Sequence, residues 1–243
     1  MPALGRLLAL VPLAAASLSG QTLAPGLRLT EPAAGAEWGV PLQILFWMTL
    51  LVVLPAAFVS ITPFLRLLVV LHFLRQALGT QSTPSNQVLV GLSLFLTLVL
   101  IQPTADRIYQ ESLAPLERRE ITQREAFERA AAPVKQFLSK YAREKDVALF
   151  LEISRAPRPR NLDDLDLRVL MPAYVLSELR VGFQIGAVLF LPFLIIDLLV
   201  ASITLSLGML QLPPIMISAP FKILLFVLAD GWNLVVGSLV KSF

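Results

Sequence analysis

Long apolar runs dominate the chain and are separated by shorter polar stretches. The longest run covers residues 183–207, and after the turn at 208–214 a second apolar run reaches Val240. At about 1.5 Å per residue, the first run makes a helix of roughly 37 Å, longer than the hydrocarbon core of a bilayer at about 30 Å. The pattern therefore predicts a membrane-competent C-terminal helical hairpin over residues 171–243.

A second apolar region covers residues 40–103 and predicts an N-terminal helical hairpin. Its first helix, at 40–62, is long enough to span a bilayer. Pro55 and Pro63 are expected to kink or end this helix because proline has no backbone N–H. A polar linker then leads to a second apolar helix, which is expected to end at Pro103.

Residues 1–20 have the layout of a secretory signal peptide, with Arg6 before a short apolar core and small residues before Gln21. Because this core is too short to span as a stable helix, we expect cleavage near Gly20 and Gln21. The alternative is a retained signal anchor. Residues 21–39 contain prolines, glycines and scattered polar residues, which indicates a flexible extracytoplasmic leader.

Residues 104–170 differ from the rest of the chain because charges of both signs are mixed throughout. Thr122 followed by Glu125 predicts a capping box at a helix start. Apolar residues then recur at steps of three and four: Phe127, Ala130, Ala131, Val134, Phe137, Leu138 and Tyr141. Arg66 and Arg75 favour a cytoplasmic linker earlier in the chain. We therefore expect a charged helical insert on the extracytoplasmic side.

The composition is typical of a membrane or membrane-complex protein. Of the 243 residues, 56% are hydrophobic and 15% charged, with a mean hydropathy of +0.73, which lies outside the usual soluble range. The net charge of +3 does not indicate nucleic-acid binding, because the basic residues are not gathered into a patch with interleaved aromatics.

Catalytic and cofactor-binding patterns do not occur in the sequence. Cysteine is absent and His72 is the single histidine, which excludes disulfides, thiolate metal sites and histidine clusters. Asp163, Asp164 and Asp166 would allow a metal site, although a solvated or helix-capping acidic run is far commoner. There is no phosphate loop, His-Glu metal pattern or Gly-x-Ser-x-Gly elbow. We expect no enzyme activity, no cofactor and no metal.

Five charged residues of the C-terminal region are candidate functional residues. Asp197, Lys222 and Asp230 should face protein, water or an opposite charge, since a charge at mid-bilayer costs at least about 2.5 kcal/mol. The helical rise puts Asp197 about 22 Å and Lys222 about 14 Å from the turn, so a pair within the hairpin and partners from another segment or subunit both remain open. Glu178 and Arg180, two positions apart, should each seek another element or subunit. For Asp197 and Lys222, a buried structural pair between protomers and an ion relay are the two alternatives.

The turn of the C-terminal hairpin sets a flexible methionine and two leucines beside a polar glutamine: Met209, Leu210, Gln211 and Leu212. Methionine fills irregular gaps, and rings of apolar side chains close pores by excluding water. These four residues are therefore candidates for a pore gasket. The alternative is an ordinary buried turn.

Long ungapped strings between residues 76 and 239 match one known pattern. They are Gln76–Thr80, Asn86–Gln87, Leu94–Thr97, Met171–Tyr174, Ser177–Leu179, Phe183–Gly186, Leu194–Asp197, Leu212–Pro214, Pro220–Lys222 and especially Leu225–Leu239. In these strings the chain resembles the FliP family, export-gate proteins of flagellar type III secretion. The resemblance is weakest in the leader and the charged insert.

The resemblance implies an all-α homo-oligomer of five copies that assembles with FliR-like and FliQ-like subunits and other membrane proteins of the export apparatus. This complex would form a channel for unfolded flagellar proteins at the inner membrane, in the flagellar basal body. Much of the hairpin would then be lifted out of the bilayer and packed between subunits, with Glu178, Asp197 and Lys222 holding the copies in register. The family's gasket is methionine-rich, whereas here Met209 stands alone, so Leu210 and Leu212 are expected to share its role.

Two other functions remain open at this stage. A core subunit of a virulence-type injectisome has a similar sequence and differs in the system it serves. A small ion-coupled carrier using Asp197 and Lys222 would act as a single chain, but it would be expected to show an inverted repeat, which the sequence lacks.

Overall fold

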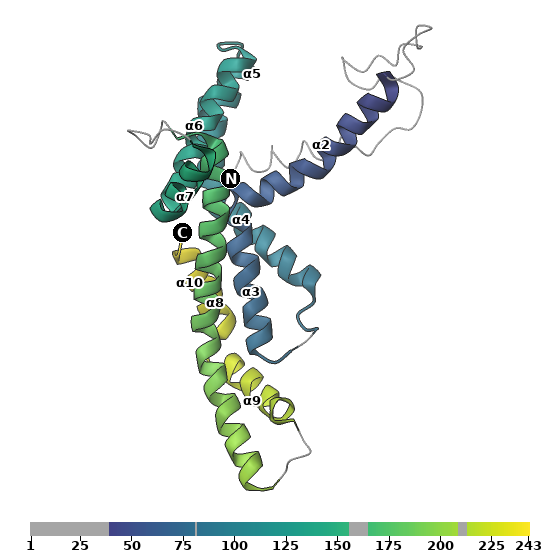
Figure 1. Ribbon diagram of the computed structural model, residues 1–243, viewed down its shortest axis with the longest axis vertical. Helices are drawn as coiled ribbons and strands as arrows, with labels where there is room; N and C mark the ends of the chain where they lie inside the picture. The colour runs from purple at the N-terminus through teal and green to yellow at the C-terminus, as the bar shows by residue number, and fades with distance from the viewer. Residues whose placement is uncertain (1–38, 81, 156–164, 209–212) are drawn as a thin grey trace. The chain divides into compact units, whose positions relative to one another are not determined.

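Every regular element in the described part of the chain is a helix. The computed structural model describes residues 39–80, 82–155, 165–208 and 213–243 (Figure 1). Its helices are α2 (Gly39–Ile61), α3 (Phe64–Ala77), α4 (Asn86–Ile108), the π-helix η2 (Tyr109–Leu113), α5 (Ala114–Glu117), α6 (Gln123–Tyr141), α7 (Glu144–Ser154), α8 (Leu167–Ser206), α9 (Pro214–Leu228) and α10 (Gly231–Lys241). The predicted all-α fold class is confirmed.

The chain divides between Phe58 and Val59 into two units, which are described separately. The helix of the first unit, α2, carries no charged residue and continues through Pro55. Pro55 therefore does not end the helix. Helix α2 ends at Ile61, and Pro63 directly precedes α3. The predicted signal peptide and nearly all of the leader lie outside the described residues.

Three of the described helical stretches are long and apolar enough to cross a membrane. They are Leu42–Ile61, Asn86–Glu117 and Leu167–Ser206. The pair α9 and α10 adds a fourth if the two helices, bent by 67°, are counted as one span. By length and composition, the described chain is therefore that of a membrane protein.

The second unit is built on α8, the long green helix in Figure 1. Its 40 residues correspond to about 60 Å of helix. The helix α3 lies along it, and the central core contains four leucine and valine side chains of α3 with no exposed surface: Leu67, Val70, Leu71 and Leu74. Gly186 of α8 permits this close approach, because a Cβ there would stand 2.6 Å from the Phe73 ring.

The charged insert packs its two longer helices, α6 and α7, against the first part of α8. A second hydrophobic cluster forms there around Leu138, Leu165, Leu170 and Tyr174. The predicted capping box is confirmed, because Thr122 and Glu125 exchange hydrogen bonds at the start of α6. The Thr122 backbone N–H and hydroxyl lower the pKa of the Glu125 carboxyl below its usual value.

The second apolar helix is longer than expected. The prediction that it ends at Pro103 was wrong, because α4 continues through this proline to Ile108 and runs on into η2. One lost hydrogen bond at a proline need not end a helix when the following residues find other support. Here η2 contacts α6, and the Ser112 hydroxyl donates to the Ala126 carbonyl oxygen at 2.6 Å.

The returning arm of the C-terminal hairpin is two helices rather than one continuous run. The chain turns at Asp230, whose φ of 49° is left-handed, and α10 begins at Gly231. A Cβ at Gly231 would fall 2.2 Å from the Phe226 ring, so the turn brings backbone and ring into direct contact. An apolar pattern alone does not reveal such a break, because both helices are apolar.

Candidate functional site

The innermost ion pair of the second unit joins α3 to α8. The Arg66 guanidinium donates to both carboxylate oxygens of Glu178, one of them at 2.8 Å, and the two side chains are 4% and 0% exposed. Arg66 also donates to the Ser242 carbonyl oxygen at 3.0 Å and stacks on the Phe243 ring, 3.8 Å from its centroid. Glu178 thus has its partner within the chain, on another element.

Next to Glu178, Ser177 and Arg180 hold the insert on α8. The Ser177 hydroxyl donates to the Asp146 carboxylate at 2.8 Å and accepts from the Arg143 backbone N–H at 2.9 Å. Arg180 reaches the other oxygen of Asp146 at 3.2 Å. Asp146 and Arg143 lie at the start of α7, so these contacts fix that end of the helix against α8.

The third site is the Lys222 cluster, formed by the side chains of Lys222, Asp197 and Ser218 and the carbonyl of Ala77. The Lys222 ammonium donates to Asp197 at 2.6 Å and to the Ala77 carbonyl oxygen at 3.1 Å. Ser218 donates to the second Asp197 oxygen at 2.5 Å. Lys222 is 1% exposed and Asp197 24%. The structure therefore brings Asp197 and Lys222 together within one chain, an arrangement that the helical rise left undecided.

Asp230 lies away from these pairs, at the break between α9 and α10. Its side chain is exposed and accepts a hydrogen bond from the Asn233 amide at 3.1 Å. The candidate gasket residues, Met209, Leu210, Gln211 and Leu212, lie outside the described residues. Of the aspartates considered for a metal site, Asp163 and Asp164 are also outside them, and Asp166 caps α8 by accepting from the Arg168 backbone N–H.

The part of the C-terminal hairpin beyond the Lys222 cluster is apolar and exposed. We call residues 198–208 and 213–217 the hairpin tip. Its exposed large side chains come from both arms: Leu198, Leu199, Ile203, Leu205, Leu207, Ile215 and Met216. An apolar surface of this extent on a membrane-type helical hairpin requires cover by lipid or by other protein.

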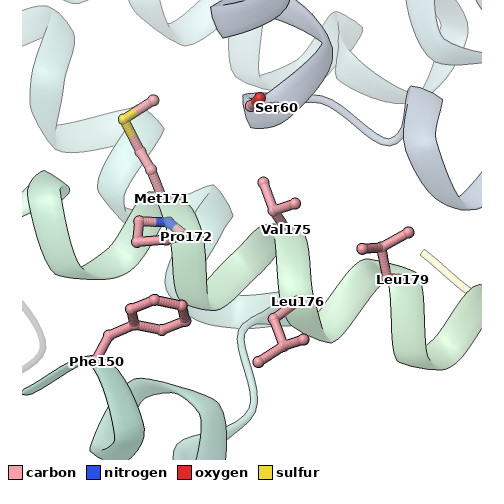
Figure 2. Close-up of a pocket in the computed structure, with 7 residues that line it drawn as sticks. All are labelled: Ser60, Phe150, Met171, Pro172, Val175, Leu176 and Leu179. Atoms are coloured by element: carbon pink, nitrogen blue, oxygen red, sulfur yellow. The ribbon is translucent and has the colours of Figure 1, made fainter. Parts of the chain in front are cut away.

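A pocket of about 440 Å³ opens between α7, α8 and the end of α2 (Figure 2). It is lined by Ser60, Phe150, Met171, Pro172, Val175, Leu176 and Leu179. Figure 2 shows Met171, Val175 and Leu179 arrayed along α8, with Phe150 on the α7 side. Six of its seven lining residues are apolar and none is charged, so the pocket is suited to apolar packing.

The comparison with known families connects this arrangement to one group of proteins. Residues 47–239, which contain most of α2 and all of α3 to α9, match the model of the FliP family. The chain belongs to the FliP family. The predicted family is therefore confirmed, and the match includes the charged insert and nearly all of the C-terminal hairpin that follows it.

Individual FliP relatives agree with the family match. A flagellar biosynthetic protein FliP of Bacillus subtilis (strain 168) is 49% identical over 201 residues, 83% of this chain and 91% of that protein. Proteins of the same name from Pectobacterium carotovorum subsp. carotovorum and Rhizobium meliloti (strain 1021) are 47% and 41% identical. These matches cover 87% and 95% of this chain, and 82% and 95% of the two relatives.

Several residues of these clusters were not identified as candidates from the FliP-like sequence. Arg66 drew attention only as a marker of membrane orientation, although a lone arginine in an apolar run was a signal that it needs a buried acid. Asp146 lies in a mixed-charge region where single acids do not stand out. The Ala77 carbonyl has no sequence signal, because any residue carries one.

Proposed function

We propose that this chain is a core subunit of a flagellar type III export gate. In this proposal several copies, five by family resemblance, assemble with FliR-like and FliQ-like subunits in the inner membrane at the flagellar basal body. The assembly conducts unfolded flagellar proteins, and the chain itself catalyses no reaction. FliP family membership and the names of its relatives support the flagellar assignment over a virulence-type injectisome.

The observation that carries the proposal is the exposed apolar hairpin tip. Its helices satisfy their backbone hydrogen bonds internally, and both arms present large apolar side chains away from the chain's own core. In an oligomer these faces would pack against neighbouring copies and converge around an axis. The turn at 209–212 would then lie where a pore is narrowest, with the charged insert on the extracytoplasmic side.

Assembly is the first part of the test. The full chain is coproduced with the FliR-like and FliQ-like proteins of its own organism and extracted in mild detergent, and the native mass is measured. A discrete complex that contains several copies of the chain is expected. A stable monomer or dimer without companions would contradict the proposal and favour the carrier alternative, for which Asp197 would be the first residue to neutralise.

The seal is tested on the assembled complex in planar bilayers. Replacing Met209 and Leu210 by alanine removes apolar volume from the proposed gasket and should raise the ion conductance of the closed complex, because a wider apolar constriction admits water. The matched control replaces Met48 and Leu51 of α2 by alanine and should leave conductance unchanged. Equal conductance of the gasket variant and the parent complex would refute the assignment of the seal to this turn.

A further inference from the structure

The Lys222 cluster joins three helices at one buried point. Lys222 and Ser218 come from α9, Asp197 from α8, and the Ala77 carbonyl from the last residue of α3. Both Asp197 oxygens accept a hydrogen bond, one from the ammonium at 2.6 Å and one from the hydroxyl at 2.5 Å. Charge-assisted hydrogen bonds of this kind are shorter and stronger than neutral ones.

The end of α3 is suited to receive the Lys222 cation. The carboxyl end of a helix carries unpaired carbonyl groups and a partial negative charge, which favours a cation there. Immediately after it the chain turns at Gly79, whose φ is 75°, and a Cβ at this glycine would meet the Ala219 Cβ at 3.5 Å. The ammonium and the close approach of Gly79 to Ala219 together fix α9 against α3.

The Lys222 cluster also marks where the core of the second unit stops. On one side of it, the central core includes Leu74, Ala77, Phe193 and Phe226. On the other side, Thr204 is the only buried residue among the described positions of the hairpin tip. The tip is therefore held by its attachment at the cluster and by its own helices, with little core packing of its own.

The first arm of the hairpin tip has a feature that favours bending. Three hydroxyl groups in the last three turns of α8 donate to carbonyl oxygens of their own helix: Ser202 to Leu198, Thr204 to Val200 and Ser206 to Ile203. Such bonds compete with the helical hydrogen bonds, slightly destabilise the helix and often bend it. The direction of the tip thus depends on how firmly its base is held.

We infer that the Lys222 cluster is a latch that sets the direction of the hairpin tip relative to α3. While Lys222 bridges Asp197 and the Ala77 carbonyl, the two arms leave the core at one fixed angle. When the bridge is broken, the arms separate from the end of α3 and the tip tilts. Within the proposed export-gate function, on which this last step depends, the latch also sets the position of the gasket.

The test measures the tip directly with pairs of spin labels. The chain contains no cysteine, so engineered cysteines are the only labelled sites. One label is placed at exposed Gln76 on α3, and the second at exposed Leu205 in the tip or at exposed Gln184 in the middle of α8. Distances are recorded by pulsed electron resonance on the full chain in detergent, with Lys222→Met, Asp197→Asn and Ser218→Ala compared with the parent.

For the 76–205 pair, Lys222→Met and Asp197→Asn should shift and broaden the distance distribution, and Ser218→Ala should do so less. The 76–184 pair should keep its parent distance distribution, because α3 and the middle of α8 pack together through the central core, which the variants should leave intact. The matched control is Lys241→Met at an exposed lysine of α10, which should change neither pair. If Lys222→Met does not accumulate, Asp197→Asn decides the question.

An unchanged 76–205 distribution in both Lys222→Met and Asp197→Asn would overturn the inference. Equal broadening of both label pairs would also overturn it, because the cluster would then stabilise the whole fold rather than the tip. These distances lie within one chain and need no assembled complex. The latch can therefore fail while the export-gate function stands, and the native mass and conductance can refute that function while the latch stands.

Discussion

The base and the tip of the C-terminal hairpin are both apolar, but the chain itself covers more of the base than of the tip. Along the base, α8 is covered by α3, α6 and α7, and it buries Tyr174, Glu178 and Gly186. Past Asp197 the same helix exposes leucine and isoleucine on most of its surface. Hydrophobicity therefore does not decide what this chain buries by itself. The base packs one face within the chain and leaves Phe183, Val188 and Leu191 exposed, whereas the tip buries almost nothing and requires lipid or other protein to cover it.

The largest effect is expected at the buried pair of the base. Replacing Glu178 by alanine leaves the Arg66 guanidinium in a buried position without its carboxylate. Removing one member of a buried ion pair typically costs about 3–5 kcal/mol. The free energy of unfolding in detergent, measured by denaturant titration, should fall by this amount.

The matched control for this change is the exposed pair of Arg124 and Glu128 on α6, 3.2 Å apart. Exposed pairs contribute about 0–1 kcal/mol, so Glu128→Ala should cost little. If Glu178→Ala were as mild as Glu128→Ala, the base would not owe its stability to the buried pair, and the contrast with the tip would weaken.

A smaller effect is expected from Gly186→Ala, which tests the packing of α3 on the base. The added methyl group would stand 2.6 Å from the Phe73 ring, and overpacking of this kind costs about 1–3 kcal/mol. Gly91→Ala in α4 is the control, since no atom lies within 4 Å of its Cβ position. That change should stabilise the helix by about 0.5–1 kcal/mol. The measurement is the thermal unfolding midpoint of each variant. A shift of both midpoints in the same direction would contradict this account.

The smallest effect is expected from Leu205→Ala in the tip. In the isolated chain Leu205 is exposed, so its truncation should change the free energy of unfolding by less than about 0.5 kcal/mol. In the assembled complex the same change should lower the temperature at which the copies dissociate, because a neighbour would cover this side chain. Leu149→Ala, at an exposed leucine of α7, is the control. An equal response of the two variants in the complex would refute the tip as an interface.

Much of the helix content could be predicted from the sequence, because apolar runs and a capping box are local signals. The run at 40–62 became α2, and Thr122 with Glu125 begins α6 as expected. The helix ends were harder to predict. Pro103 lies inside a helix whose continuation is supported by distant contacts, and the break at Asp230 separates two helices of similar hydrophobicity.

The candidate site was only partly predictable. The charges of Glu178, Asp197 and Lys222 stood out because the surrounding residues are apolar. Their partners did not, since Arg66 lies 112 residues before Glu178, and the Ala77 carbonyl lies 145 residues before Lys222. A single sequence shows how residues are spaced along one helix, but it does not show which distant helices contact each other. The rise along a straight hairpin left the Asp197–Lys222 pair undecided, and the long lysine side chain makes the pair possible.

The contacts of Arg66 have a consequence for how the protein is synthesised. Arg66 binds Glu178 and the Ser242 carbonyl, and the latter lies 176 residues further along the chain. At roughly 5–20 residues per second on the ribosome, about 9–35 s separate the synthesis of the two groups. During that interval α3 carries a guanidinium that lacks first Glu178 and then Ser242. The complete set of Arg66 contacts can therefore form only after Ser242 has been made, and until then this arginine needs other polar partners such as water or lipid headgroups.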